Sequence, residues 1–148
     1  MELGLVDVVD INDQVLKTID RIKATDDDIL RVAGVFIVND KKEILLQLRS
    51  EKSFRYPSFW DCAGGGHVDA GEDYKTCAPR ELFEETKIKA ELEFLGKHYI
   101  ELPDGRKHFN AFFKGTYNGE FEADPKEVSK LKFLSLDEIK KMIERKDK

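Results

Sequence analysis

Three glutamates near the middle of the chain have the residue type and spacing of a metal site. Glu81, Glu84 and Glu85 belong to one stretch, GHVDAGEDYKTCAPRELFEETKI, at residues 66–88. On a helix, at about 100° per residue, positions three and four apart share one face. Like charges on one face repel each other unless a cation lies between them, and hard divalent cations such as Mg²⁺ prefer oxygen ligands. The spacing therefore predicts a Mg²⁺ and phosphate site on a helix, preceded by a glycine-rich turn at 64–66.

A run of glutamates is also typical of an ordinary solvated helix face. The neighbouring residues favour the metal site over that alternative. Arg80 directly precedes the run, Glu72 lies upstream, and three consecutive glycines follow an apolar segment.

This stretch resembles the Nudix box, G-x5-E-x7-R-E-U-x-E-E-x-G-U, in which U is an aliphatic residue. Every defined position matches except Lys87, where the family has glycine. That position follows the helix, where left-handed geometry is common, so a non-glycine residue costs on the order of 1 kcal/mol and affects the helix end rather than the chemistry. Trp60-Asp61 before AGGGHV, and the Val- and Asp-rich N-terminus, resemble the branch that includes isopentenyl diphosphate isomerase-like Nudix hydrolases.

The resemblance implies roles for the residues of the box. Arg80 and Glu72 are expected to pair and to lock the loop to the helix, since arginine offers a planar fork to a carboxylate. The general base is either a box glutamate or one outside it, for which Glu127 is the main candidate and Glu120 and Glu122 are weaker ones. The expected metal ligands are Gly66, through its carbonyl, Glu81, Glu84 and Glu85. The expected catalytic residues are Arg80, Glu81, Glu84, Glu85 and Glu127.

Substrate specificity is expected to lie outside the box, in the loop at 50–58 and the hairpin at 103–105. The box supplies metal and phosphate chemistry that every diphosphate substrate shares, so discrimination needs polar groups and aromatic faces placed elsewhere. The candidate substrate-binding residues are Arg49 and Arg55, for phosphate, and Phe54 and Tyr56, for stacking on a base.

The length of 148 residues predicts a single domain at 1–148 with room for a core. Alternating apolar residues on both sides of 12–13 predict an N-terminal β-hairpin. Further strands are predicted at 31–38, 43–49, 59–63, 92–102, 107–117 and 128–134, and helices at 72–86 and 136–145. With the resemblance, the predicted fold is α+β: a Nudix α/β/α sandwich with a mixed β-sheet between helices, plus the N-terminal hairpin. Pro79 within the first helix predicts either a kink or a late start with Thr76 as N-cap.

The net charge of −5 argues against nucleic acid backbone binding, which needs a cationic surface. No apolar run approaches membrane-spanning length and the N-terminus lacks a basic segment, so we expect neither a membrane span nor a signal peptide. Cys62 and Cys77 suit core positions in a reducing, cytoplasmic compartment.

The predicted function is that of a Mg²⁺-dependent Nudix hydrolase, with Mn²⁺ as an alternative metal. It would cleave the diphosphate linkage of a nucleoside diphosphate derivative or of a nucleoside di- or triphosphate, and its partner would be a small phosphorylated substrate. A homodimer is compatible with this prediction. One alternative is an isopentenyl diphosphate isomerase-like enzyme, but that family places its catalytic cysteine directly before Gly66-His67, where this chain has Gly65. The other is a catalytically silent Nudix domain that senses a ligand, against which the intact carboxylates argue.

Overall fold

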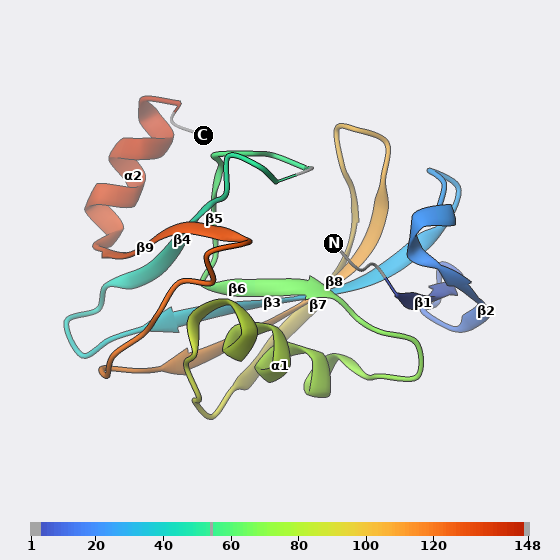
Figure 1. The fold of residues 1–148 in the computed structure, drawn as a ribbon, viewed down its shortest axis with the longest axis horizontal. Helices are drawn as coiled ribbons and strands as arrows, with labels where there is room; N and C mark the ends of the chain where they lie inside the picture. The colour runs from blue at the N-terminus through green and yellow to red at the C-terminus, as the bar shows by residue number, and fades with distance from the viewer. Residues whose placement is uncertain (1–3, 54, 147–148) are drawn as a thin grey trace.

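The computed structural model describes residues 4–53 and 55–146, and within them it shows a nine-stranded mixed sheet with two α-helices and a short 3-10 helix (Figure 1). The strands are β1 (Leu5–Val9), β2 (Val15–Asp20), β3 (Ile29–Val38), β4 (Ile44–Arg49), β5 (Trp60–Asp61), β6 (Gly64–His67), β7 (Glu93–Glu101), β8 (Lys107–Thr116) and β9 (Val128–Leu134). The helices are η1 (Arg21–Lys23), α1 (Tyr74–Thr86) and α2 (Leu136–Glu144).

The long strand β3 organises the sheet. It pairs in parallel with β8 and antiparallel with β1, β4 and β6. Strands β7 and β9 extend the sheet through β8 and β4. Because side chains alternate between the two faces of a strand, the register assigns each residue to a face. Val32 of β3 lies opposite both His67 and Asn110, so these three residues share one face.

The two helices cover opposite faces of the sheet (Figure 1). The face that meets α1 is apolar: Ala33, Val35 and Ile37 of β3 are fully buried in one core cluster with Leu82 of α1. On β9, Phe133 packs against this cluster, whereas its neighbour Lys132 lines a groove beside α2. The predicted α+β sandwich, with a mixed sheet between helices, is therefore confirmed.

The predicted N-terminal hairpin is also present, since β1 and β2 pair antiparallel and β1 continues the sheet beside β3. Its turn is fastened through Asp13, which is 7% exposed. The Asp13 carboxylate accepts from Arg31 Nε at 2.7 Å, from Lys97 Nζ at 2.7 Å and from the Tyr74 hydroxyl at 2.9 Å. One carboxylate thus ties the hairpin to β3, β7 and α1.

The start of α1 differs from the predicted late start. The N-cap is Asp73, whose carboxylate accepts the Thr76 N–H at 2.7 Å, so Thr76 is not the cap. Pro79 lies inside the helix, on its exposed side. Lys87 ends the helix with φ 62°, the left-handed geometry expected at this position of the box.

The three consecutive glycines form a strand, not the predicted turn. Gly64, Gly65 and Gly66 begin β6 and pair with β3. Glycine is needed here for close approach: a Cβ on Gly65 would lie 2.6 Å from the Ala33 carbonyl oxygen, and one on Gly66 would lie 2.5 Å from the Glu81 carboxyl carbon. The glycines let the strand lie directly against β3 and against the side chains of α1.

Candidate active site

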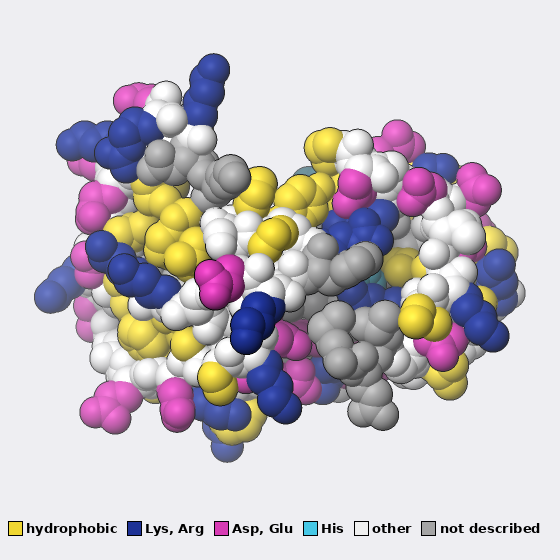
Figure 2. All heavy atoms as spheres, turned by 45° about the horizontal axis from the view of Figure 1, so that its top comes forward, with side chains coloured by type: hydrophobic (Ala, Val, Ile, Leu, Met, Phe, Trp, Pro, Cys, Tyr) yellow, Lys and Arg dark blue, Asp and Glu magenta, His cyan; other side chains and the backbone are white. Residues whose placement is uncertain are grey.

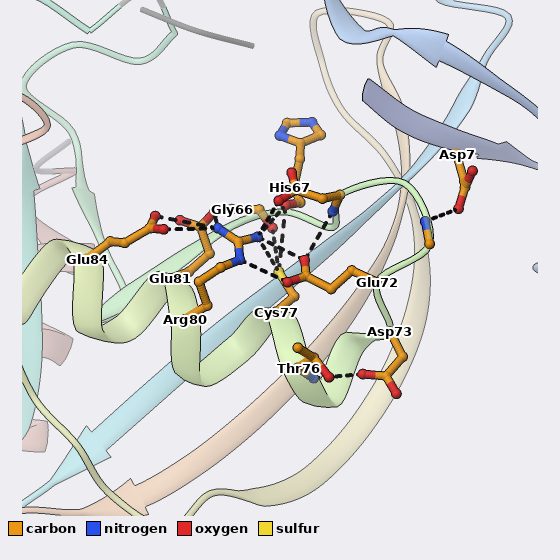
Figure 3. A network of polar contacts seen from close by, with 12 residues as sticks. Asp7, Gly66, His67, Glu72, Asp73, Thr76, Cys77, Arg80, Glu81 and Glu84 are labelled. Atoms are coloured by element: carbon orange, nitrogen blue, oxygen red, sulfur yellow. Dashed lines mark hydrogen bonds and ion pairs between the residues drawn. The ribbon is translucent and has the colours of Figure 1, made fainter. Parts of the chain in front are cut away.

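Arg80 is the centre of the polar network between α1 and the loop that precedes it (Figure 3). Its Nε and Nη2 atoms each donate to the Glu72 carboxylate at 2.8 Å, which confirms the predicted pair. Its Nη1 atom lies 2.9 Å from Glu81 Oε1 and 3.3 Å from Glu84 Oε1. Nη2 also reaches the His67 carbonyl oxygen at 3.5 Å. The guanidinium therefore fixes the loop to the helix and lies between two of the box carboxylates.

The three box glutamates lie at different depths. Glu85 is buried and accepts the Gly65 N–H at 2.7 Å. The Glu81 side chain is 14% exposed and lies against Gly66. The Glu84 side chain is 54% exposed. The three carboxylates of α1 therefore range from buried, at Glu85, to largely exposed, at Glu84.

Burial makes the ionised forms of the inner carboxylates unfavourable. It raises the pKa of Glu81 to about 7, with the charge of Glu84 adding to the effect and Arg80 opposing it. It raises the pKa of Glu85 well above its ordinary value, and the Gly65 N–H only partly compensates. The charge of Glu127 contributes to both shifts, so Glu127 lies within electrostatic reach of the box. The pKa of Glu127 is itself raised, first by burial and then by Asp124 and Glu84.

This donor set has the chemistry that a hard divalent cation requires, namely carboxylate oxygens whose repulsion a cation would relieve. Within 4–53 and 55–146, however, no three His, Cys, Asp or Glu side chains converge tightly enough to hold a metal. Arg80 lies between Glu81 and Glu84 in the place of a shared cation. The ligand set Gly66, Glu81, Glu84 and Glu85 stays a prediction.

The substrate-binding candidates of the 50–58 loop are only partly brought together. Arg55 donates to Asp104 at 3.1 Å, which links the loop to the hairpin. The Tyr56 ring packs edge-on against Phe59, with centroids 5.3 Å apart, and has the Arg106 guanidinium 6.0 Å from its centroid. Phe54 lies outside the described residues.

Arg49 has a different setting from Arg55. Its Nε donates to the Arg55 carbonyl oxygen at 3.2 Å, and its Nη1 lies 3.6 Å from Asp61. Its charge acts on Glu127. Arg49 therefore supports the loop from within and faces the candidate base.

Strands β6 and β8 carry further functional candidates on one face of the sheet. The rings of His67 and His108 lie 5.3 Å apart on the sheet face away from the α1 core. The Asn110 side-chain oxygen on that face is buried and has no hydrogen-bond partner within the described part of the chain. Phe109 points to the opposite face, where it packs on Tyr99. The alternation of side chains along β8 was the sequence signal for this distinction, because it places Phe109 and Asn110 on opposite faces of the sheet.

Comparisons with known proteins identify the family to which this chain belongs. The NUDIX domain family model matches residues 28–148. An uncharacterized Nudix hydrolase, PA4841, from Pseudomonas aeruginosa is 30% identical over 132 residues, which are 88% of this chain and 78% of that protein. An isopentenyl-diphosphate delta-isomerase from Schizosaccharomyces pombe is 32% identical over 136 residues, 76% of this chain and 58% of that protein. The crystal structure of DR0079 from Deinococcus radiodurans has a TM-score of 0.83 at 21% identity, covering 96% of this chain and 90% of that one.

The chain therefore belongs to the NUDIX family, and its matches include proteins of the isopentenyl diphosphate isomerase branch. The predicted class of enzyme, a hydrolase acting on pyrophosphate bonds, is supported at this level. Within the described residues, no helix is long and apolar enough to cross a membrane.

Proposed function

We propose that this protein is a Mg²⁺-dependent hydrolase that cleaves the diphosphate linkage of a nucleoside diphosphate derivative or of a nucleoside di- or triphosphate. The observation that carries the proposal is the row of Glu81, Glu84 and Glu85 along α1, locked to the preceding loop by the Arg80–Glu72 pair. Mn²⁺ is an alternative metal, since it accepts the same oxygen ligands.

The box residues would bind the cation, and the rest of the site would position substrate and proton acceptor. Gly66, Glu81, Glu84 and Glu85 would hold the metal, which when bound neutralises diphosphate charge and lowers the pKa of a coordinated water. Arg80 holds Glu81 in place through its 2.9 Å ion pair. Glu127 would act as general base and take the proton of the attacking water. Its raised pKa supports this role, because a base works best when its pKa lies nearer the working pH.

A test is phosphate release from a panel of nucleotides with Mg²⁺, with Mn²⁺ and with chelator. We expect activity only with a divalent cation. Glu85→Gln should lower kcat by about 100-fold or more with the fold intact, because it removes a ligand charge. Glu91→Gln is the matched control, since Glu91 is an exposed glutamate outside the box. Near-normal turnover by Glu85→Gln would overturn the metal assignment.

A second candidate is an isopentenyl diphosphate isomerase-like enzyme, which the 32% identity to the Schizosaccharomyces pombe isomerase favours. The chemical environment of Cys62 supports an isomerase less well. The Cys62 thiol lies 3.3 Å from the Gly64 carbonyl oxygen, and burial raises its pKa well above the ordinary value. Conversion of isopentenyl diphosphate to its allylic isomer, followed by NMR, separates this candidate from the hydrolase. A catalytically silent sensor would instead bind nucleotide and release no phosphate.

The remaining properties follow as parts of the proposal. We expect a single domain over 1–148, a cytoplasmic location, a small nucleotide as partner rather than a nucleic acid backbone, and a homodimer as one assembly state. Light scattering during gel filtration measures the last of these directly.

A further inference from the structure

Three arginines from separate parts of the chain approach one another beside the candidate active site. Arg21 lies on η1, Arg55 on the loop between β4 and β5, and Arg106 in the hairpin between β7 and β8. In Figure 1 these three segments rise on the side of the sheet away from α1. Arg55 and Arg106 share the Asp104 carboxylate, at 3.1 and 2.9 Å.

The N-terminal segment contacts the same hairpin directly. A Cβ on Gly105 at the hairpin tip would lie 2.7 Å from Asp26 Oδ2, so the tip packs against the segment that follows η1. The backbone of Arg21 is held as well, because its N–H donates to the Gly4 carbonyl oxygen at 2.9 Å. The fold thus brings the segment that follows η1 against the hairpin that carries Arg106.

Arg21 is the member of this cluster whose charge has no ion pair within the described residues. Arg21 is half-buried, and no carboxylate of residues 4–53 or 55–146 lies within ion-pair distance of it. Burial and the positive charge of Arg106 lower the pKa of Arg21. Asp104 is the carboxylate that Arg55 and Arg106 share. An anionic ligand would relieve the repulsion.

The two neighbouring histidines are kept neutral by the same environment. Burial, followed by the charge of Arg106, lowers the pKa of His108 to about 4. Burial and the charge of Arg21 lower the pKa of His67 well below its ordinary value. The cationic character of this region therefore comes from the arginines.

Arg21 lies within electrostatic reach of the box carboxylate Glu81 and of Glu127. The negative charges of Glu81 and Glu127 both act on Arg21, in opposition to the arginines. Figure 2 shows Lys and Arg side chains gathered near the middle of this face, with acidic side chains around them. Arg21 thus lies within electrostatic reach of a carboxylate that is suited to a metal.

We propose that Arg21, Arg55 and Arg106 form an anion clamp that binds a terminal phosphate group of the substrate. The inference rests on the proposed hydrolase function and names its substrate class: nucleotides that end in a phosphate, in preference to nucleoside diphosphates capped by a neutral sugar. A terminal phosphate carries about two negative charges at neutral pH, which suits a site that presents guanidinium groups. Guanidinium forks also suit phosphate geometry.

The kinetic test compares Arg21→Gln with wild type on a nucleoside triphosphate and on a nucleoside diphosphate sugar of the same base. We expect KM for the triphosphate to rise about tenfold or more, as for loss of a charge-assisted contact, and kcat/KM for the sugar nucleotide to change little. Arg21→Lys should recover part of the loss. Lys23→Gln is the control, since it removes an exposed charge from the same 3-10 helix. Equal effects of Arg21→Gln on both substrates would overturn the preference.

A binding test separates the clamp from the hydrolase function. Inorganic tripolyphosphate is titrated by calorimetry into metal-free protein in chelator, where the box cannot contribute a cation. Wild type and Lys23→Gln should bind alike and Arg21→Gln about tenfold more weakly, with unchanged circular dichroism. If wild type hydrolyses no nucleotide, the hydrolase proposal fails while this comparison still tests the clamp. Equal binding by all three proteins would refute the clamp.

Discussion

At the scale of single residues, the site brings together carboxylates whose ionised forms the fold alone does not stabilise. The buried Glu81 and Glu85 have raised pKa values, and the compensation comes from Arg80 and the Gly65 N–H. Buried carboxylates of this kind destabilise the folded state when they ionise. With a cation bound, ionisation of these carboxylates would instead stabilise the folded state. This is the thermodynamic reason to expect metal binding here.

The raised pKa of Glu81 gives a pH-dependent prediction for the metal-free protein. A carboxyl group whose folded pKa is about 7, against an ordinary 4.5, contributes stability below pH 4.5 and loses it as pH rises through 7. The glutamine of Glu81→Gln cannot ionise. The free energy of unfolding of the variant, relative to that of wild type, should therefore rise by about 3 kcal/mol between pH 4.5 and pH 8. Denaturant unfolding in chelator at several pH values measures this difference.

The difference in the free energy of unfolding between wild type and Glu81→Gln isolates the contribution of Glu81 from those of other titrating groups. His67 and His108 have lowered pKa values, so they add stability as pH rises and act in the opposite direction. Their contribution is common to wild type and variant and cancels. A difference that stays constant from pH 4.5 to 8 would contradict the raised pKa of Glu81.

Mutation can separate the structural role of the Arg80 guanidinium from the effect of its positive charge. Arg80→Ala should lower the free energy of unfolding by about 1–3 kcal/mol, because it leaves Glu72 and Glu81 without their charge-assisted partner. Arg80→Lys restores the charge but not the fork, so it should recover only part of the stability and activity. Urea unfolding and turnover of both variants test this. Wild-type stability in Arg80→Ala would show that the 2.8 Å contacts to Glu72 contribute nothing.

At the scale of elements, the sequence predicted those parts that depend on local patterns. The helix α1, its left-handed end at Lys87 and the final helix with its Ser135 capping box follow from residue spacing. The glycine strand β6 was predicted as a turn, because consecutive glycines indicate turns unless another chain segment approaches closely. That approach, to β3 and α1, is a property of the tertiary structure. The arginine cluster was missed for the same reason, since its members belong to three distant segments.

The loop between β4 and β5 is expected to select among nucleotides. Tyr56 packs on Phe59 and lies near Arg106 of the opposing hairpin, so its ring is placed where a base could stack. Tyr56→Ala should change the ranking of nucleotide substrates by kcat/KM while leaving the Mg²⁺ requirement unchanged. Tyr99→Ala, on a tyrosine that packs against the other face of β8, is the control. If Tyr56→Ala slows every substrate by the same factor, the base is recognised elsewhere.

At the scale of the whole molecule, the clamp proposal makes the N-terminal hairpin a support of the site, although the NUDIX family match begins at residue 28. The hairpin leads directly into η1, which carries Arg21. Its position depends on Asp13, which contacts Arg31, Lys97 and Tyr74. On this proposal, segments outside the box would adapt a shared phosphate chemistry to a particular substrate.

Loss of the Asp13 carboxylate should therefore loosen the hairpin and weaken the clamp together. Asp13→Asn leaves the half-buried Arg31 and the exposed Lys97 without a counter-charge, so the free energy of unfolding should fall by about 2 kcal/mol. Hydrogen exchange should accelerate in residues 5–20 more than in α1, and KM for a nucleoside triphosphate should rise as in Arg21→Gln, because η1 follows the hairpin. Asp27→Asn, at an exposed aspartate of the same region, should change neither quantity. Uniformly faster exchange throughout the chain, with an unchanged KM, would show that Asp13 stabilises the fold without positioning Arg21.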